Sequence, residues 1–151
     1  MPGLDDLYRE IILDHYRSPR NRGELAPPAA HAVGHNPLCG DEIEVFLDVQ
    51  VNPDGTAVVG DIKVGGQGCS ISQSSASMMS QAVKGKPVHE VRALVHKFRS
   101  MMSIDETTEA DADVKLGDLE ALQGVVKFPV RIKCAVLAWN TLTEALAQAD
   151  A

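Results

Sequence analysis

The strongest constraint on the fold is the order in which two hydrophobic periods follow each other along the chain. Between residues 43 and 51 the side chains alternate between two faces, which is the pattern of a β-strand with one buried face. One face is entirely apolar (Ile43, Val45, Leu47, Val49 and Val51), and the other carries Glu44, Phe46, Asp48 and Gln50. The turn sequence Asn52-Pro53-Asp54-Gly55 separates this run from a second β run, Thr56 to Val64, so the two runs predict a hairpin. The extended segment that leads to Asn36 is the candidate for another strand. We therefore expect a small antiparallel β-sheet of about three strands.

Helical periodicity flanks this predicted sheet. Leu4 to Tyr16 places apolar residues at helical spacing before it, and the periodic segments after Ser70 are all helical. These later candidate helices are 71–84, 88–102 and 130–149. Ile104 to Glu120 is strongly acidic and predicts an exposed connection that ends in a short helix through Leu122. Because the strands precede the long run of helices, we expect an α+β fold, with the sheet packed against helices and residues 1–151 in a single domain.

Composition excludes several classes of protein. With 44% hydrophobic and 23% charged residues, the chain has the balance of an ordinary globular protein. Lys and Arg total 14 against 21 for Asp and Glu, and the resulting net charge of −7 disfavours a nucleic-acid partner. No apolar run approaches the roughly 20 residues of a membrane helix, and Met1 to Glu10 shows no export signal. We therefore expect a cytoplasmic protein with neither nucleic acid nor a membrane as its partner.

The chain has three cysteines, an odd number that cannot form a complete set of intramolecular disulfides. In a reducing cytoplasm they are buried fillers, metal ligands or reactive groups. Cys39 precedes the first long predicted strand, Cys69 follows the glycine-rich stretch Gly65 to Gly68, and Cys134 lies in the first turns of the last predicted helix. Glycine permits tight turns and close backbone approach, which an inert core thiol does not require.

Cys39 and Asp41 form the sharpest local pattern. Residues at positions i and i+2 of an extended segment point to the same side, so this thiolate and this carboxylate can converge on one point. Zn²⁺ prefers four tetrahedral ligands, and Cys39, Asp41, Cys69 and Cys134 would make such a set. Two alternatives remain at this point. A free cysteine is often a small buried hydrophobe, and structural zinc sites usually show paired Cys-x₂₋₄-Cys spacing, which this chain lacks.

Charged neighbours indicate that the thiols could be reactive. Arg131 stands one helical turn before Cys134, and both Cys69 and Cys134 are expected to open helices, where the helix dipole favours an anion. Both effects lower a thiol pKa and raise the thiolate fraction. The alternative is that Arg131 is simply a solvated charge. His31 and His35 precede the Cys39 loop and could line the same site.

Several segments resemble one known family, the SufU/IscU-type proteins of iron–sulfur cluster biogenesis. The matching segments are Leu7-Tyr8, His15-Tyr16, Pro19-Arg20-Asn21, Asn36-Pro37-Leu38-Cys39-Gly40-Asp41, Gly66-Gln67-Gly68-Cys69-Ser70-Ile71-Ser72 and Arg131-Ile132-Lys133-Cys134-Ala135 through Trp139. They span nearly the whole chain in the family's order. The resemblance implies an α+β fold with a small antiparallel sheet packed on helices. It also implies that Cys39, Asp41, Cys69 and Cys134 converge on one metal.

Departures from the scaffold branch of that family point to its SufU branch. IscU-type scaffolds carry His before the third cysteine, where this chain has Lys133. They also carry a Leu-Pro-Pro-Val-Lys segment shortly before it, where this chain reads Val126-Lys127-Phe128-Pro129-Val130. The acidic connection around 104–124, with its Leu116-Gly117-Asp118-Leu119 run, looks like the insertion of the SufU branch.

By resemblance, the protein is a zinc-dependent sulfur acceptor of the sulfurtransferase type. Cys39 would take persulfide sulfur from a SufS-type cysteine desulfurase, Arg131 would assist, and downstream iron–sulfur assembly proteins would receive the sulfur. The alternative is a scaffold on which a [2Fe–2S] cluster is assembled, with iron or the cluster in place of zinc. Lys133 disfavours that alternative, because a protonated ammonium group cannot ligate a metal. A binding module with purely structural zinc is a further alternative.

Overall fold

A computed structural model of the chain describes residues 2–37, 40–102 and 116–149, with side chains described from residue 8 onward. Within these residues, no helix is long and apolar enough to cross a membrane. The elements, in chain order, are α1 (Pro2–Arg17), β1 (Ala30–Asn36), β2 (Asp41–Val51), β3 (Ala57–Gln67), α2 (Ser70–Val83), α3 (Val88–Met101), the 3₁₀ helix η1 (Gly117–Lys127) and α4 (Pro129–Gln148). This order confirms the predicted α+β fold.

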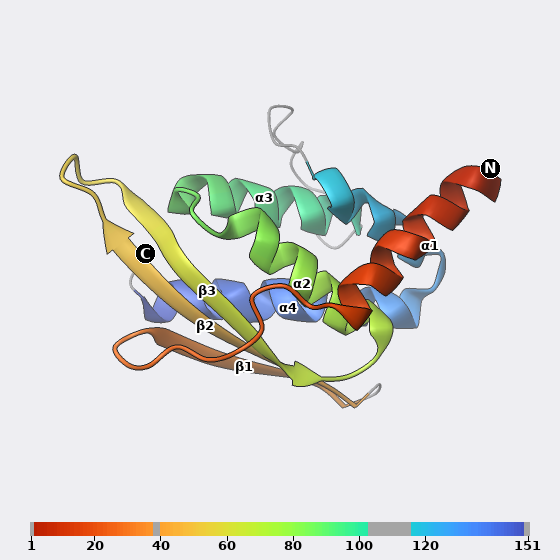
Figure 1. The fold of residues 1–151 in the computed structure, drawn as a ribbon, viewed down its shortest axis with the longest axis horizontal. Helices are drawn as coiled ribbons and strands as arrows, with labels where there is room; N and C mark the ends of the chain where they lie inside the picture. Colours follow the sequence, from red (N-terminus) through yellow and green to blue (C-terminus); the bar gives the residue numbers. More distant parts are fainter. Residues whose placement is uncertain (1, 38–39, 103–115, 150–151) are drawn as a thin grey trace.

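The sheet has three antiparallel strands in the order β1-β2-β3 (Figure 1). Val45 in the central strand pairs with Ala32 of β1 and Val64 of β3. The predicted hairpin and its additional strand are therefore confirmed. The free edge of β3 is partly covered, because the Gly23 N–H donates to the Val64 carbonyl at 3.1 Å and the Val64 N–H donates to the Asn21 carbonyl at 2.9 Å.

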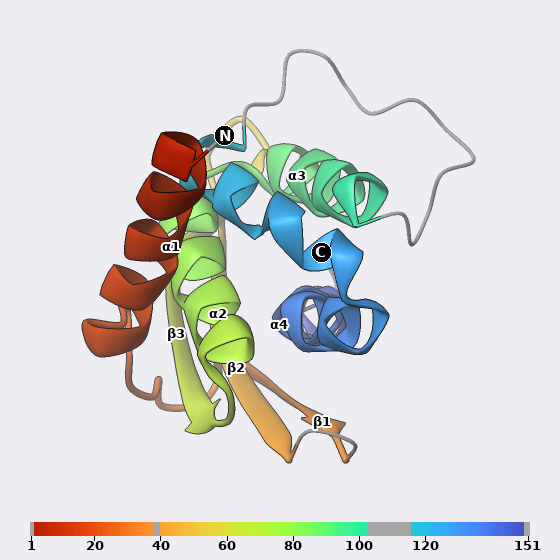
Figure 2. The same ribbon diagram turned by 90° about the vertical axis from the view of Figure 1, so that its right-hand side faces the viewer.

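Helices α2 and α4 pack on one face of the sheet, and α3 and η1 lie on the far side of these two helices (Figures 1 and 2). The β2 residues Ile43, Val45 and Leu47 are buried against them, as their alternation predicts. The prediction is wrong for Val51, which is 70% exposed. The strand has a register shift between Asp48 and Val49. Val49 still packs against the core, and only the last two residues, Gln50 and Val51, are exposed.

Two segments extend further than the sequence pattern indicates. β3 continues through the glycines to Gln67, and a Cβ at Gly66 (φ +107°) would lie 2.0 Å from the Glu42 carbonyl oxygen of the neighbouring strand. Only glycine fits there. The connection before α4 is not simply exposed, because η1 and its preceding residue bury Leu116, Leu119 and Leu122. The remainder of the acidic connection, 103–115, lies outside the described residues.

Helix α2 buries a row of hydroxyl groups, which we call the serine seam: Ser72, Ser74, Ser75, Ser77 and Ser80. Ser75 Oγ donates to the Ala135 carbonyl at 2.6 Å and accepts from Trp139 Nε1 at 3.1 Å, which ties α2 to α4. Ser77 Oγ accepts the Arg20 N–H at 2.8 Å and lies 2.7 Å from His15 Nδ1, which ties α2 to the end of α1. The hydroxyls therefore let two helices pack closely on α2 without leaving these polar groups unpaired.

Candidate metal centre

Three elements bring Asp41, Cys69 and Cys134 together. Asp41 is the first residue of β2, Cys69 is the N-cap residue of α2, and Cys134 lies on α4. One ligand atom from each, a carboxylate oxygen or a sulfur, lies within 4.8 Å of the other two. The structure thus gathers three of the four predicted metal ligands. The fourth, Cys39, lies outside the described residues.

Asp41 anchors the turn that carries Cys69. Its side chain is buried, Oδ1 accepts the Cys69 N–H at 2.9 Å, and Oδ2 lies 3.9 Å from Cys69 Sγ. Gly68 makes this approach possible, since a Cβ there would lie 2.3 Å from Asp41 Oδ1. The carboxylate therefore holds the start of α2 with one oxygen and faces the thiol with the other.

Cys134 is fully buried and receives a hydrogen bond from β1. Asn36 Nδ2 donates to its sulfur at 3.8 Å, and a donor to sulfur favours the thiolate. The expectation that Cys134 opens its helix is wrong, because α4 begins at Pro129, more than one turn earlier. The helix dipole acts mainly within the first turn, so it favours an anion at Cys69 and not at Cys134. Nothing in the sequence pattern indicates this role for Asn36, although it belongs to the same short motif as Cys39.

Arg131 is exposed and faces both thiols. The charge of the Cys69 thiolate, followed by that of the Cys134 thiolate, raises the pKa of the Arg131 guanidinium above its ordinary value, and hydrogen bonding to each sulfur adds to the shift. The same attraction stabilises the thiolates. Arg131 therefore lies close to both sulfurs, while Lys133, one residue before Cys134, is exposed.

The two histidines of β1 are engaged elsewhere. The His31 ring stacks on Phe46 with centroids 4.2 Å apart and lies 3.6 Å from a Glu44 oxygen. His35 Nδ1 is 3.9 Å from Glu42 Oε1. Among the described residues, no histidine joins the Asp41, Cys69 and Cys134 group. The expectation that these histidines could line the site is therefore not supported by the described geometry.

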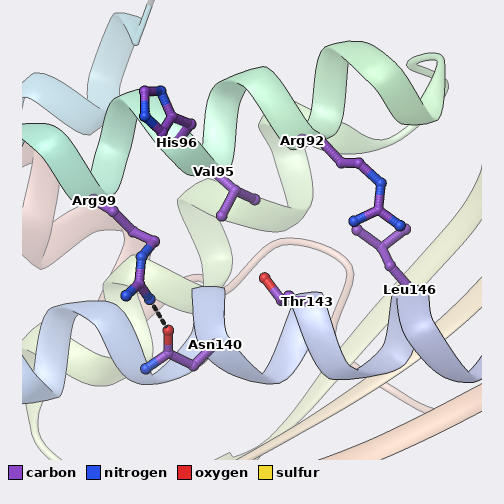
Figure 3. A pocket seen from close by; sticks show the side chains of 7 residues that line it. All are labelled: Arg92, Val95, His96, Arg99, Asn140, Thr143 and Leu146. Atoms are coloured by element: carbon purple, nitrogen blue, oxygen red, sulfur yellow. Dashed lines mark hydrogen bonds between the residues drawn. The ribbon is translucent and has the colours of Figure 1, made fainter. Parts of the chain in front are cut away.

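A groove of about 430 Å³ between α3 and α4 is separate from this group (Figure 3). Arg92, His96 and Arg99 line it from α3, and Asn140 and Thr143 line it from α4. Arg99 donates a hydrogen bond to Asn140 across the groove. None of the lining residues belongs to the Asp41, Cys69 and Cys134 group.

The residue types in the group suit a metal ion. Two thiols and one carboxylate are ligands that Zn²⁺ accepts, and three separate elements of the fold position them. Three like-charged ligand atoms this close would repel one another once ionised, and a cation removes that cost. The fold and this group together define an α+β protein with a candidate metal centre built from thiols and a carboxylate.

Comparison with known proteins identifies the family. A family profile described as NifU-like N terminal domain matches residues 7–149, and the chain belongs to this family. It is 46% identical to the zinc-dependent sulfurtransferase SufU of Bacillus subtilis (strain 168), over 97% of this chain and 94% of that protein. It is 42% identical to the iron–sulfur cluster assembly scaffold protein IscU of Streptococcus pyogenes serotype M1, over 95% of this chain and 84% of that protein.

Solved structures agree with this assignment. The SUF-system protein FiSufU from Fervidobacterium islandicum AW-1 superposes with a TM-score of 0.76 at 31% identity, covering 91% of this chain and 94% of that one. A NifU-like N-terminal protein from Brucella abortus superposes with a TM-score of 0.79 at 26% identity, covering 97% and 96%. The predicted resemblance to SufU/IscU-type proteins is confirmed.

Proposed function

We propose that this protein is a zinc-dependent sulfurtransferase of iron–sulfur cluster assembly, which accepts persulfide sulfur from a cysteine desulfurase. The observation that carries the proposal is the convergence of Asp41, Cys69 and Cys134 beside Arg131. The 46% identity to a protein named as a zinc-dependent sulfurtransferase supports it. The lower identity to IscU scaffolds, 42% and 39%, makes the scaffold function the second candidate.

Asp41, Cys69 and Cys134, with Cys39 as the fourth ligand, would hold Zn²⁺. The bound ion would keep the ligand thiols deprotonated at neutral pH, which is the chemistry it supplies. The donor set fits this role, since Cys134 is fully buried, Asp41 is 2% exposed and both still face a common point with Cys69. The Asn36 amide would also stabilise the Cys134 thiolate.

The transfer step itself would be a thiol–disulfide type of exchange at Cys39. Its thiolate attacks the outer sulfur of the persulfide on the desulfurase cysteine, a new S–S bond forms at Cys39, and the S–S bond on the desulfurase breaks. The desulfurase cysteine leaves as a thiolate and takes up a proton, so the exchange has no net redox change. Arg131 would assist by stabilising thiolate charge at the site.

The partners follow from this chemistry. A SufS-type cysteine desulfurase would supply the sulfur, and downstream iron–sulfur assembly proteins would consume it. Thiols that must stay reduced suit the cytoplasm, which is where we place the protein. We also propose that residues 1–151 act as one domain, because all three described ligands come from elements that share one core.

The direct test is a Cys39→Ala variant incubated with desulfurase and cysteine. We expect it to lose its stimulation of sulfide production, because the acceptor thiol is gone. Zinc content measured on the same samples separates loss of the acceptor from loss of the metal. Sulfide production equal to that of the unaltered protein would exclude Cys39 as the acceptor.

Purification without air distinguishes the two candidate functions. Stoichiometric zinc in a colourless protein supports sulfur transfer. A coloured protein with equimolar iron and inorganic sulfide supports assembly of a [2Fe–2S] cluster, for which a carboxylate ligand beside thiolates would favour release. The measurement is metal analysis joined to the visible absorption spectrum of the freshly made sample.

A further inference from the structure

We propose that Arg22 is a positioning residue for Cys69, fixing the turn between β3 and α2 and so the affinity of the metal centre. This inference rests on the proposed function, because it concerns the same site. Arg22 Nη2 donates to the Gly66 carbonyl at 2.6 Å, and Nη1 donates to Gln73 Oε1 at 3.1 Å. Gly66 precedes the Cys69 turn and Gln73 follows it, so one guanidinium joins both sides of the turn.

The turn needs such an external support. It begins at Gly68, directly after β3 ends at Gln67, and glycine is the residue with the most backbone freedom to lose on folding. Asp41 contacts this turn at Cys69, through its N–H and its thiol. A guanidinium has a planar fork of donors, so it can fix two acceptors in one geometry, which the single ammonium group of lysine cannot do.

Arg22 is itself held in register with β3. The residues on either side of it make the backbone hydrogen bonds to Val64, through Asn21 and Gly23. Arg22 forms an isolated bridge with Val64, so its guanidinium reaches the turn from a segment tied to the strand edge. The side chain is exposed, and it does not belong to the Asp41, Cys69 and Cys134 group.

The side-chain amide of Gln73, which accepts from Arg22, has its oxygen paired and its nitrogen unpaired. Gln73 is 8% exposed, and among the described residues its Nε2 has no hydrogen-bond partner. Arginine only donates, so an arginine neighbour turns the Gln73 oxygen outward and leaves the amide nitrogen facing the interior. A buried donor without a partner among the described residues costs stability, so its removal is not expected to destabilise the protein.

A substitution of Gln73 can therefore separate an effect on stability from an effect on metal affinity. Gln73→Leu removes the acceptor for Arg22 together with the unpartnered donor. We expect the metal-free protein to keep its unfolding midpoint or gain slightly, while metal affinity falls. A residue with only a structural role would change both in the same direction.

The experiment is a Co²⁺ titration of the metal-free full chain, followed by the cobalt–thiolate absorption bands. We expect Arg22→Gln and Gln73→Leu each to bind Co²⁺ roughly 10-fold more weakly, the lower end of the 10–100-fold range for residues that orient metal ligands. Arg22→Lys should bind Co²⁺ almost as weakly as Arg22→Gln, because a single ammonium group cannot hold both acceptors in one geometry. The matched control is Arg9→Gln, an exposed arginine on α1, which should bind as the unaltered protein does.

The outcomes separate this inference from the proposed function. If the unaltered protein shows no cobalt–thiolate bands, the metal centre itself fails. If it does show them and both variants bind Co²⁺ with unchanged affinity, only the role of Arg22 is overturned. Should Arg22→Gln fail to fold, Gln73→Leu decides alone, since it leaves the arginine in place.

Discussion

Two polar clusters lie along helix α2, and they differ in their balance of donors and acceptors. In the first, around Ser77, the hydroxyl contacts His15 Nδ1 and the Arg20 N–H, and His15 Nε2 lies 3.8 Å from Asp118. In the second, at the helix start, a carboxylate and two sulfurs crowd within 4.8 Å. The first cluster pairs donors with acceptors, while the second gathers groups that become anions.

The balance of donors and acceptors indicates the role of each cluster better than its residue types do. Ser77, His15 and Asp118 are the residue types of a hydrolytic triad. Ser77 is nevertheless fully buried, so no substrate can reach its hydroxyl. Its hydrogen bonds instead join α2 to His15 of α1 and to the Arg20 N–H, and His15 in turn lies 3.8 Å from Asp118 of η1. Asp41, Cys69 and Cys134 are three groups that become anions, with exposed Arg131 beside them, and their mutual repulsion is relieved only by a cation or by protons. We therefore assign a structural role to the first cluster and metal binding to the second.

Removing the metal should have the largest effect on the free energy of unfolding, and it should act through the second cluster. At free zinc a thousand times the dissociation constant, binding contributes about 4 kcal/mol to the free energy of unfolding. A chelator should remove that contribution from the unaltered protein and from a Ser77→Ala variant equally. The measurement is chemical denaturation with and without chelator. Equal stability with and without chelator, in protein shown to contain zinc, would contradict the assignment.

Asp41→Asn should weaken metal binding while keeping the turn. The amide oxygen can still accept the Cys69 N–H that Oδ1 accepts now, but the negative charge is lost. We expect at least a roughly 100-fold loss of zinc affinity, equivalent to about 2.7 kcal/mol. Competition with a chromophoric chelator measures the affinity. Asp41→Ala is the comparison, because it removes the acceptor too and should also destabilise the metal-free protein. An Asn variant with unchanged zinc affinity would exclude the carboxylate as a ligand.

Ser77→Ala should behave oppositely to Asp41→Asn, with lower stability and unchanged metal affinity. It leaves the Arg20 N–H and His15 Nδ1 without their shared partner, which costs about 1–3 kcal/mol in the free energy of unfolding. Metal affinity should not change, since none of these atoms belongs to the metal centre. Denaturation of the metal-free protein measures the loss, and exposed Ser18→Ala is the matched control. A large fall in metal affinity would show that the two clusters are coupled.

The sequence predicted the sheet, its antiparallel pairing and most helix positions, because these depend on local periodicity and turn chemistry. Through the family resemblance of their short motifs, it also predicted that Asp41, Cys69 and Cys134 converge, while its fourth ligand, Cys39, lies outside the described residues. It could not place Asn36 against Cys134, or His15 against Ser77, because those contacts join residues far apart in the chain and leave no periodic signal. The exposed Val51 escaped prediction because it lies at the end of β2, beyond Val49, which still packs against the core, and the alternation of side chains does not show where a strand leaves the core.

The smallest expected effect is a pH dependence that belongs to the first cluster alone. Burial, and then the charge of Arg20, lowers the pKa of His15 below its ordinary value of 6.5, although Asp118 and Asp14 oppose the shift. The unfolded chain therefore binds more protons than the folded one just below that value. The contribution of neutral His15 to stability is fully present above about pH 6.5, and it is lost as the pH drops toward the folded-state pKa of His15.

His15→Gln should remove this part of the pH dependence, because glutamine does not titrate. Both proteins should be compared without metal, since acid also releases metal by protonating thiols and would add a slope of its own. We expect the free energy of unfolding to fall more steeply between pH 7.5 and 5.5 in the unaltered protein than in the variant, with the other titrating groups common to both. Parallel slopes would mean that His15 gains its proton in the folded state as easily as in the unfolded chain. Burial would then not disfavour the charged form of His15, contrary to the argument from its buried position.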